Sequence, residues 1–234
     1  RLALDARMWD SGGIGTYVAL NLAIAGIGKI DVYDHDNIES HNLNRQLLYY
    51  GGVGRNKANV LADRLRKINP KTEVHPYPIA FTREQERRIH PGQYDVIFSC
   101  LDAFAPRKLL SDFAGRIQTP LINGSVTTFD ANVDVYLPGI NPCLDCRYDY
   151  ASLAHLDDRP ASCANQEANV VMPNAMAGAM MVNSALHILA GGKEHDHMTK
   201  RFMYSSSRQD RHKLMWIPIT TEKDTTACCT EESR

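Results

Sequence analysis

Side chains that suit a polyphosphate ligand gather within one short stretch of this chain. Asn42, Arg45 and Lys57 follow one another closely. An arginine offers a forked donor to phosphate oxygens, a lysine a compact positive charge, and an asparagine a neutral amide. Asp34 and Asp36 come just before them, and an acid in such a place accepts ribose hydroxyls in dinucleotide folds. The residue types therefore predict chemistry on a nucleoside triphosphate such as ATP, with the charge of the leaving pyrophosphate neutralised by the protein.

A glycine-rich turn precedes these residues and would place the nucleotide. Gly12, Gly13 and Gly15 follow a short apolar run, and residues 17–25 carry apolar side chains at helical spacing. We expect a strand, a tight turn and a helix, followed by a second strand over residues 29–34. Amides at the start of such a helix can approach a phosphate closely, and the helix dipole favours the anion. The alternative to a nucleotide site is that these glycines only mark the start of a helix and bind no ligand.

Asp10 departs from the full dinucleotide fingerprint, which has a glycine at this place. A carboxylate beside a polyphosphate is electrostatically unfavourable. We expect either that Asp10 points away from the ligand or that phosphate binding is altered. Ordinary capping of the following helix by Asp10 and Ser11 is the alternative.

A third predicted strand, residues 94–100, places Asp102 just beyond its carboxyl end. Open α/β sheets bind their ligands at this edge. A carboxylate there suits a Mg²⁺ ion shared between the protein and the phosphates. Taken alone, Asp102, Arg45 or Lys57 could equally be a solvated charge on a loop. The prediction of a phosphate and metal site therefore rests on the joint occurrence of the three residues.

The chain resembles the ubiquitin-activating-type adenylyltransferases, the ThiF-MoeB-HesA family, which includes the enzymes of thiamine and molybdopterin biosynthesis in bacteria. The resemblance covers about residues 12–189. The stretches that carry it are Gly12-Gly13-Ile14-Gly15, Ala25-Gly26-Ile27-Gly28-Lys29, Asp34-His35-Asp36, Asn42-Leu43-Asn44-Arg45-Gln46, Gly54-Arg55-Asn56-Lys57, Ile68-Asn69-Pro70 and Cys100-Leu101-Asp102.

The resemblance implies a role for each matching residue. Asp34 would hold the ATP ribose, with Asn42 and Arg45 on the phosphates. Lys57 would stabilise the transferring phosphoryl region, and Asp102 would bind Mg²⁺. The reaction implied is attack of a C-terminal carboxylate on the α-phosphate, which gives an acyl-adenylate and pyrophosphate. The carboxylate would belong to a small ubiquitin-like or sulfur-carrier protein or to a peptide, and the enzyme would be a homodimer.

Three departures from the family keep other functions open. Asp10 replaces a glycine, and Ala103 stands where an asparagine commonly follows the metal-binding acid. Relatives also have an N-terminal helix whose arginine reaches the partner's ATP, whereas this chain opens directly before its first strand. A catalytically degenerate subunit that binds a partner is therefore one alternative. An NAD-dependent oxidoreductase is another, but it leaves Arg45, Lys57 and Asp102 unexplained.

Cysteine spacing suggests a structural zinc site. Cys143 and Cys146 form a C-x-x-C pair, which can grip one tetrahedral Zn²⁺. The family completes such a site with a second pair near the C-terminus, where this chain has Cys228 and Cys229; a metal-free tail is the alternative. Relatives place a thiol near Cys163 that in some takes up an acyl or sulfur intermediate, although an inert thiol is equally open.

Length and composition agree with one α/β domain over residues 1–234. We expect a Rossmann-like, doubly wound, mostly parallel sheet with additional antiparallel strands in the C-terminal half. Residues 1–125 would form the nucleotide-binding half, and 126–234 the carrier, zinc and dimer half. The added strands are expected at 131–137, 201–206 and 214–219, with the last two antiparallel, and a helix is expected at 172–189.

The charge balance of the chain limits the classes of partner that it could bind. The 234 residues carry a formal net charge of −1, so no electrostatic case exists for nucleic acid. No apolar run is long enough to span a bilayer. With no secretory signal before the first strand, a reducing cytoplasm is the expected location.

Overall fold

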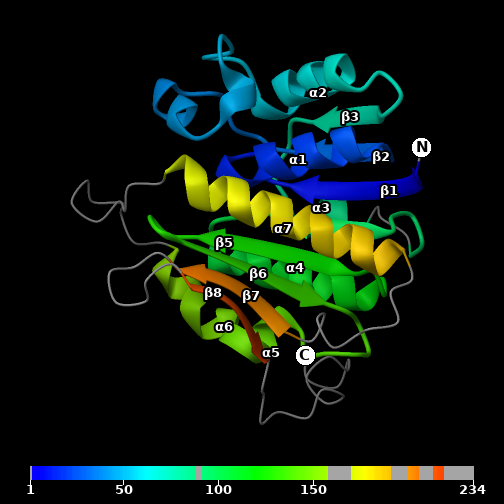
Figure 1. Ribbon diagram of the computed structural model, residues 1–234. Coiled ribbons are helices and arrows are strands. Elements are labelled where there is room, and N and C mark those ends of the chain that lie inside the picture. Colours follow the sequence, from blue (N-terminus) through cyan, green and yellow to red (C-terminus); the bar gives the residue numbers. More distant parts are fainter. Residues whose placement is uncertain (1, 88–90, 158–169, 191–199, 206–212, 219–234) are drawn as a thin grey trace.

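A single mixed sheet organises the molecule, a computed structural model that describes residues 2–87, 91–157, 170–190, 200–205 and 213–218 (Figure 1). Its eight strands lie in the order β3-β2-β1-β4-β5-β6-β7-β8. The strands are β1 Leu2–Trp9, β2 Ile27–Tyr33, β3 Glu73–Tyr77, β4 Val96–Ser99, β5 Leu121–Val126, β6 Asp130–Tyr136, β7 Lys200–Ser205 and β8 Lys213–Pro218.

Strand direction divides the sheet into two parts. The pairs from β3 through β5 are parallel, whereas β5/β6, β6/β7 and β7/β8 are antiparallel. The predicted Rossmann-like fold, with its antiparallel C-terminal strands, is confirmed. Strands β3 and β5 were not predicted from the sequence.

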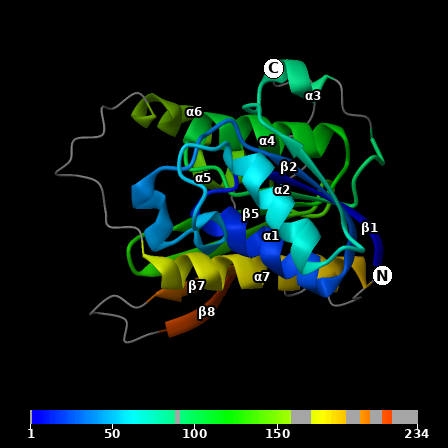
Figure 2. The same cartoon turned by 90° about the horizontal axis from the view of Figure 1, so that it is seen from above.

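Helices cover both faces of this sheet, and Figure 2 shows α4 on the opposite side from α1 and α7. The α-helices are α1 Gly13–Ala25, α2 Lys57–Ile68, α3 Arg83–Glu86, α4 Phe104–Arg116, α5 Leu144–Tyr148, α6 Tyr150–Leu153 and α7 Val171–Leu189. Three 3₁₀ turns are η1 Ser40–Asn44, η2 Leu47–Tyr49 and η3 Ala154–Leu156. No helix within the described ranges is long and apolar enough to cross a membrane.

Each face of the sheet has its own apolar core, because side chains alternate along a strand. In β1, Ala6 and Met8 pack with α1, α2 and α7, whereas Trp9 packs with α4 on the other side. In β4, Phe98 and Ile97 divide in the same way. The strands are thus held between two layers of helices.

The helix α7 lies alongside α1 although the two are far apart in sequence (Figure 1). A Cβ on Gly178 of α7 would lie 2.5 Å from the Cβ of Tyr17 in α1, so the absence of a side chain permits this close crossing. Further along α7, the sulfur of Met181 occupies the place that a Cβ on Gly124 of β5 would need. The C-terminal helix is therefore fitted against both the nucleotide half and the centre of the sheet.

The strand order also fixes where a ligand would bind. The connections from β1 and from β4 run to opposite sides of the sheet, so a crevice forms between their carboxyl ends. The glycine turn follows β1, Asp34 follows β2, and Asp102 follows β4. All three reach the same edge.

Candidate nucleotide site

A cleft of about 380 Å³ opens at this edge of the sheet. Polar and glycine residues dominate its wall, and they come from six separate segments of the chain. Those used below are Asp10, Gly12, Gly13, Asp36, Asn42, Arg45, Lys57, Cys100, Asp102, Arg107 and Asn174.

The glycine turn forms one wall, and its shape depends on close approaches. Asp10 has a φ of 66°, a left-handed conformation that glycine adopts most easily. Its Oδ1 accepts a hydrogen bond of 2.7 Å from the Gly12 amide. A Cβ on Gly15 would lie 2.2 Å from the Asp10 carbonyl oxygen, and one on Gly13 would lie 2.2 Å from Oδ1 of Asn174. The turn therefore requires glycine at position 15, where the clash is with backbone, whereas a side chain at position 13 would first have to displace Asn174.

Asp34 lies directly behind this turn and is 5% exposed. Its Oδ2 accepts hydrogen bonds from the Ser11 amide at 2.9 Å and the Ser11 hydroxyl at 2.6 Å. Its Oδ1 accepts one from the Asp36 amide at 2.9 Å. The Tyr49 hydroxyl in turn bonds the Ser11 carbonyl at 2.7 Å. Asp34 thus fixes the turn, and Asp36 is the acid of the pair that lines the cleft.

Lys57 begins α2 and points its ammonium group to the cleft. The residue is 6% exposed, and its Nζ lies 2.7 Å from Oδ2 of Asp36. Asn56 places it there by capping α2 and by donating to the Asp34 and Asp36 carbonyls. Burial alone would lower the pKa of Lys57, but the bond to Asp36 and the charges of Asp34 and Asp10 raise it above 10.5. The lysine is therefore a fixed cation.

Asn42 lies in the 3₁₀ turn η1, Arg45 follows that turn directly, and both line the cleft. Oδ1 of Asn42 accepts the Glu39 amide at 2.9 Å and so holds the turn in place. Nη1 of Arg45 donates to Oδ1 of Asn44 at 2.9 Å, whereas its buried Nε has no partner among the described residues. Burial lowers the pKa of Arg45 below its ordinary value, and Asp10 opposes that shift. Arg45 therefore keeps its charge and has a donor to spare.

Asp102 is exposed and stands just before α4. Asp157 caps that helix, since its carboxylate accepts the Phe104 amide at 2.9 Å and the Ala105 amide at 2.8 Å. Arg107 is 8% exposed and braces the same loop by donating to the Leu101 carbonyl at 2.7 Å. These contacts hold the backbone on both sides of the Asp102 carboxylate.

Asp10 is the unusual acid of this cleft. It is partly buried, and burial of its carboxyl group, followed by the negative charge of Asp34, raises its pKa from 3.8 to about 8. Lys57 and the Gly12 amide oppose this shift. At neutral pH the group is therefore mostly protonated.

A model described as the ThiF family matches residues 11–228 of the chain. The chain belongs to the ThiF family. The resemblance read from the short motifs is thereby confirmed at family level.

Curated ThiF-family relatives include the sulfur carrier protein adenylyltransferase of Thermus thermophilus. It is 35% identical over 187 residues, which are 77% of this chain and 67% of that protein. The adenylyltransferase and sulfurtransferase UBA4 of Kluyveromyces lactis is 32% identical over 185 residues, 77% of this chain and 40% of that protein. This chain spans well under two thirds of the sulfurtransferase.

Solved structures support the fold. Escherichia coli MccB in complex with MccA-N7isoASN superposes with a TM-score of 0.80 at 22% identity, covering 97% of this chain and 67% of that one. MccB with ATP gives a TM-score of 0.77 at 24% identity, covering 97% and 66%. At these identities the likeness concerns the fold alone.

The structure brings together most of the residues predicted for this ThiF-family site. Seven line the one cleft: Gly12, Gly13, Asp36, Asn42, Arg45, Lys57 and Asp102. Gly15 and Asp34 lie behind its wall as supports. Arg107 and Asn174 also line the cleft and were not predicted. Arg107 could have been noticed as the cation one turn into the helix after Asp102, but Asn174 carries no local signal in the sequence.

The cysteines fall into separate groups. Cys143 caps α5 and is 4% exposed, and its sulfur accepts the Cys146 amide at 3.4 Å, so the C-x-x-C pair forms one tight turn. Cys100 lines the nucleotide cleft, and burial raises the pKa of its thiol well above 9.0, which leaves it a weak nucleophile. The other predicted cysteines lie outside the described residues: Cys163, Cys228 and Cys229.

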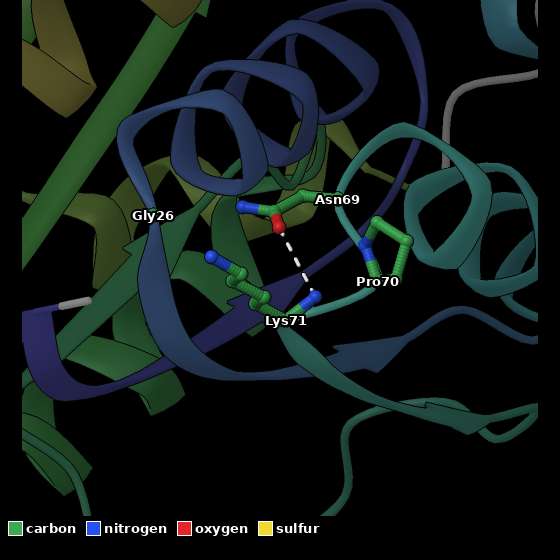
Figure 3. A pocket seen from close by; sticks show the side chains of 4 residues that line it. All are labelled: Gly26, Asn69, Pro70 and Lys71. Carbon is green, nitrogen blue, oxygen red and sulfur yellow. Dashed lines mark hydrogen bonds between the residues drawn. The ribbon is translucent and has the colours of Figure 1, made fainter.

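A second cavity lies at the opposite, amino end of β2 and β3 (Figure 3). It is shallow and is lined by Gly26, Asn69, Pro70 and Lys71. Asn69 serves as a brace there, because it donates to the Ala23 carbonyl at 2.7 Å and accepts the Lys71 amide at 3.1 Å. The Ile-Asn-Pro motif thus joins the ends of α1 and α2, far from the cleft.

Proposed function

We propose that this protein is an ATP-dependent adenylyltransferase that activates the C-terminal carboxylate of a small ubiquitin-like or sulfur-carrier protein or of a peptide. The observation that carries the proposal is the convergence of Arg45, Lys57 and Asp102, from three separate segments, on the cleft beside the glycine turn. A fold kept only as a scaffold has no need of two cations and an acid at this edge.

Each polar group has a task in the proposed reaction. Lys57 and Arg45 would neutralise the phosphates, and the spare Nε of Arg45 can donate to a phosphate oxygen. Asp36, which faces the cleft, would receive the ribose hydroxyls, while Asp34 holds the turn behind it instead of contacting the ribose as predicted. The substrate carboxylate would attack the α-phosphorus while the bond to the pyrophosphate oxygen breaks. Positioning and charge neutralisation suffice for this substitution, so no nucleophile from the enzyme is required.

Asp102 fits a magnesium ligand. Its carboxylate is exposed at the cleft and its backbone is held on both sides by Asp157 and Arg107. Carboxylate oxygens together with phosphate oxygens are ligands that Mg²⁺ prefers. A bound Mg²⁺ would supply further neutralisation of the phosphates.

The acceptor follows from the relatives. The Thermus thermophilus protein is named for a sulfur carrier protein, and the MccB structures hold MccA, so a carrier protein or a peptide is the proposed substrate class. Transfer of the acyl group to a thiol, with Cys163 as the candidate, remains part of the proposal. A homodimer is also proposed: Met172 at the start of α7 is 67% exposed and offers an apolar contact, whereas Met181 is buried in the core.

A structural zinc ion is the second proposed metal. Cys143 and Cys146 lie one helical turn apart, and the proposed remaining ligands are Cys228 and Cys229. Cys143 is a free thiol, whereas Cys146 takes part in a disulfide and must be reduced before it can supply a thiolate to the ion. Thiolate ligands fit a reducing compartment such as the cytoplasm. Metal analysis of Cys143→Ser should show less zinc per chain than the wild type, and Cys100→Ser should not. Equal zinc in all three proteins would end this part of the proposal.

The first test of function is calorimetric titration with ATP and Mg²⁺. We expect binding in the wild type and a loss of at least tenfold in affinity for Lys57→Ala, because a charged hydrogen bond contributes about 1.5 kcal/mol or more. Lys71→Ala is the matched control, since it removes the same charge at the far cavity of Figure 3. NAD is titrated in parallel.

The outcomes separate the candidate functions. ATP binding that depends on Lys57 but not on Lys71 supports adenylation, and pyrophosphate release on adding a carrier protein with an intact C-terminus then identifies the acceptor. No ATP binding favours the partner-binding subunit, an alternative that the occupied Gly12 amide specifically suggests. Binding of NAD without binding of ATP would favour the NAD-dependent oxidoreductase.

A further inference from the structure

A carboxyl group of the protein itself, that of Asp10, occupies the start of α1. Gly12 is the residue before the first helical turn, where amides have no partner within the helix and are available to a phosphate. The Asp10 side chain turns back and its Oδ1 takes the Gly12 amide at 2.7 Å. This bond joins residues two apart, which differs from a helix cap on the second or third amide of the helix.

The same carboxyl group also faces the cations of the cleft. When Asp10 is ionised, as it is at pH 9, its negative charge acts on both Lys57 and Arg45, and all three residues line the cleft. Asp10 is therefore in contact with one donor and within the electrostatic field of the two cations that a polyphosphate needs. Glycine, the residue that the fingerprint has at this place, would leave the amide and the cations to the ligand.

We propose that Asp10 sets the affinity of the cleft for the phosphates of its nucleotide, by occupying the Gly12 amide and by holding a competing carboxyl group beside Lys57 and Arg45. This inference rests on the proposed function and deepens it. Tight phosphate binding requires the Asp10 side chain to give up the amide. The residue thus weakens binding of the phosphates and leaves binding of the nucleoside unchanged.

Two substitutions divide the two effects. Asp10→Asn keeps an oxygen that can accept the Gly12 amide but removes the charge. Asp10→Gly removes both, and a glycine at a φ of 66° relieves the backbone, so the variant should fold. Asp63→Asn is the control, because it removes one negative charge from the exposed surface of α2, outside the cleft.

The experiment is calorimetry at pH 9, with Mg²⁺·ATP and adenosine as separate probes. We expect Asp10→Gly to bind ATP about tenfold more tightly than the wild type, which is the effect of one hydrogen bond to a charged group. Asp10→Asn should fall between the two, and Asp63→Asn should match the wild type. Adenosine, which has no phosphate, should bind all four proteins equally.

Several results would overturn the inference. Equal or weaker ATP binding by Asp10→Gly would show that Asp10 does not compete, and an equal gain for adenosine would show that the effect is not on phosphates. If neither the wild type nor Asp10→Gly binds ATP, the proposed function fails as well. ATP binding by Asp10→Gly alone would support the inference in its strongest form.

Discussion

Replacing Asp10 with asparagine should change how the stability of the protein depends on pH. The pKa of Asp10 is 3.8 in an unfolded chain and about 8 in the folded protein, where burial and Asp34 disfavour its charge. The folded state therefore holds a proton that the unfolded state releases. Stability from this group is complete below pH 3.8 and is lost as pH rises toward 8. Asparagine has no proton to release, so the variant should lack this loss.

The size of the effect follows from the two pKa values. Between pH 4 and pH 7 the wild type should lose about 4 kcal/mol relative to Asp10→Asn, since one unit of pKa corresponds to about 1.4 kcal/mol. This is a large share of the roughly 5–15 kcal/mol that stabilises a typical domain. The groups that act on the Asp10 carboxyl are Asp34 after β2, Lys57 at the start of α2, Asp102 after β4 and the Gly12 amide. Arg45, directly after η1, also interacts with its charge.

The assay is urea unfolding of both proteins at half-unit steps from pH 4 to pH 9, without nucleotide. The quantity of interest is the difference in unfolding free energy between the wild type and Asp10→Asn. The contributions of the other titrating groups are the same in both proteins and cancel in this difference. Asp63→Asn serves again as the control for loss of a surface charge. A difference that stays constant across this range would refute the reasoning, for it would mean that Asp10 ionises in the folded protein as it does in the unfolded chain.

Three further substitutions test the packing and capping described above. Gly178→Ala should cost about 2–3 kcal/mol in urea unfolding, because its Cβ would lie 2.5 Å from that of Tyr17. Gly51→Ala, with a φ of 76° and open space around it, should cost only about 1 kcal/mol, and equal costs would contradict the close crossing. Asp157→Ala should lower stability by about 1 kcal/mol through loss of the cap on α4, and an unchanged melting temperature would argue against that cap. Ser99→Ala should leave stability unchanged or raise it by about 1 kcal/mol, since this fully buried hydroxyl has no partner among the described residues, and a clear loss on unfolding would contradict this.

The fold could be predicted where the sequence carries a local signal. Glycines mark the turn after β1, and the apolar run of residues 94–100 contains β4. The two unpredicted strands lack such signals. The sequence of β3, Glu-Val-His-Pro-Tyr, contains a proline and is mostly polar, and β5 includes Asn123 and Gly124. Both become strands because the sheet offers them partners, which is a tertiary effect.

The site was predictable to the extent that its residues lie near recognisable motifs. The cations and Asp102 come from such motifs and meet in the cleft. The division of work between Asp34 and Asp36 could not be predicted, because it depends on where Ser11 turns its amide and hydroxyl. Asn174 could not be predicted either, since it meets Gly13 through the packing of α7 on α1.

The contact between Asn174 and Gly13 has a consequence for biosynthesis. The glycine turn leaves the ribosome long before α7, the helix that closes its wall, has been made. At about 5–20 residues per second, several seconds separate the two events. During that interval the nascent chain holds the signature of a nucleotide site without its finished shape. The protein should therefore gain its ligand only after α7 has been made, so that shorter nascent chains do not sequester nucleotide.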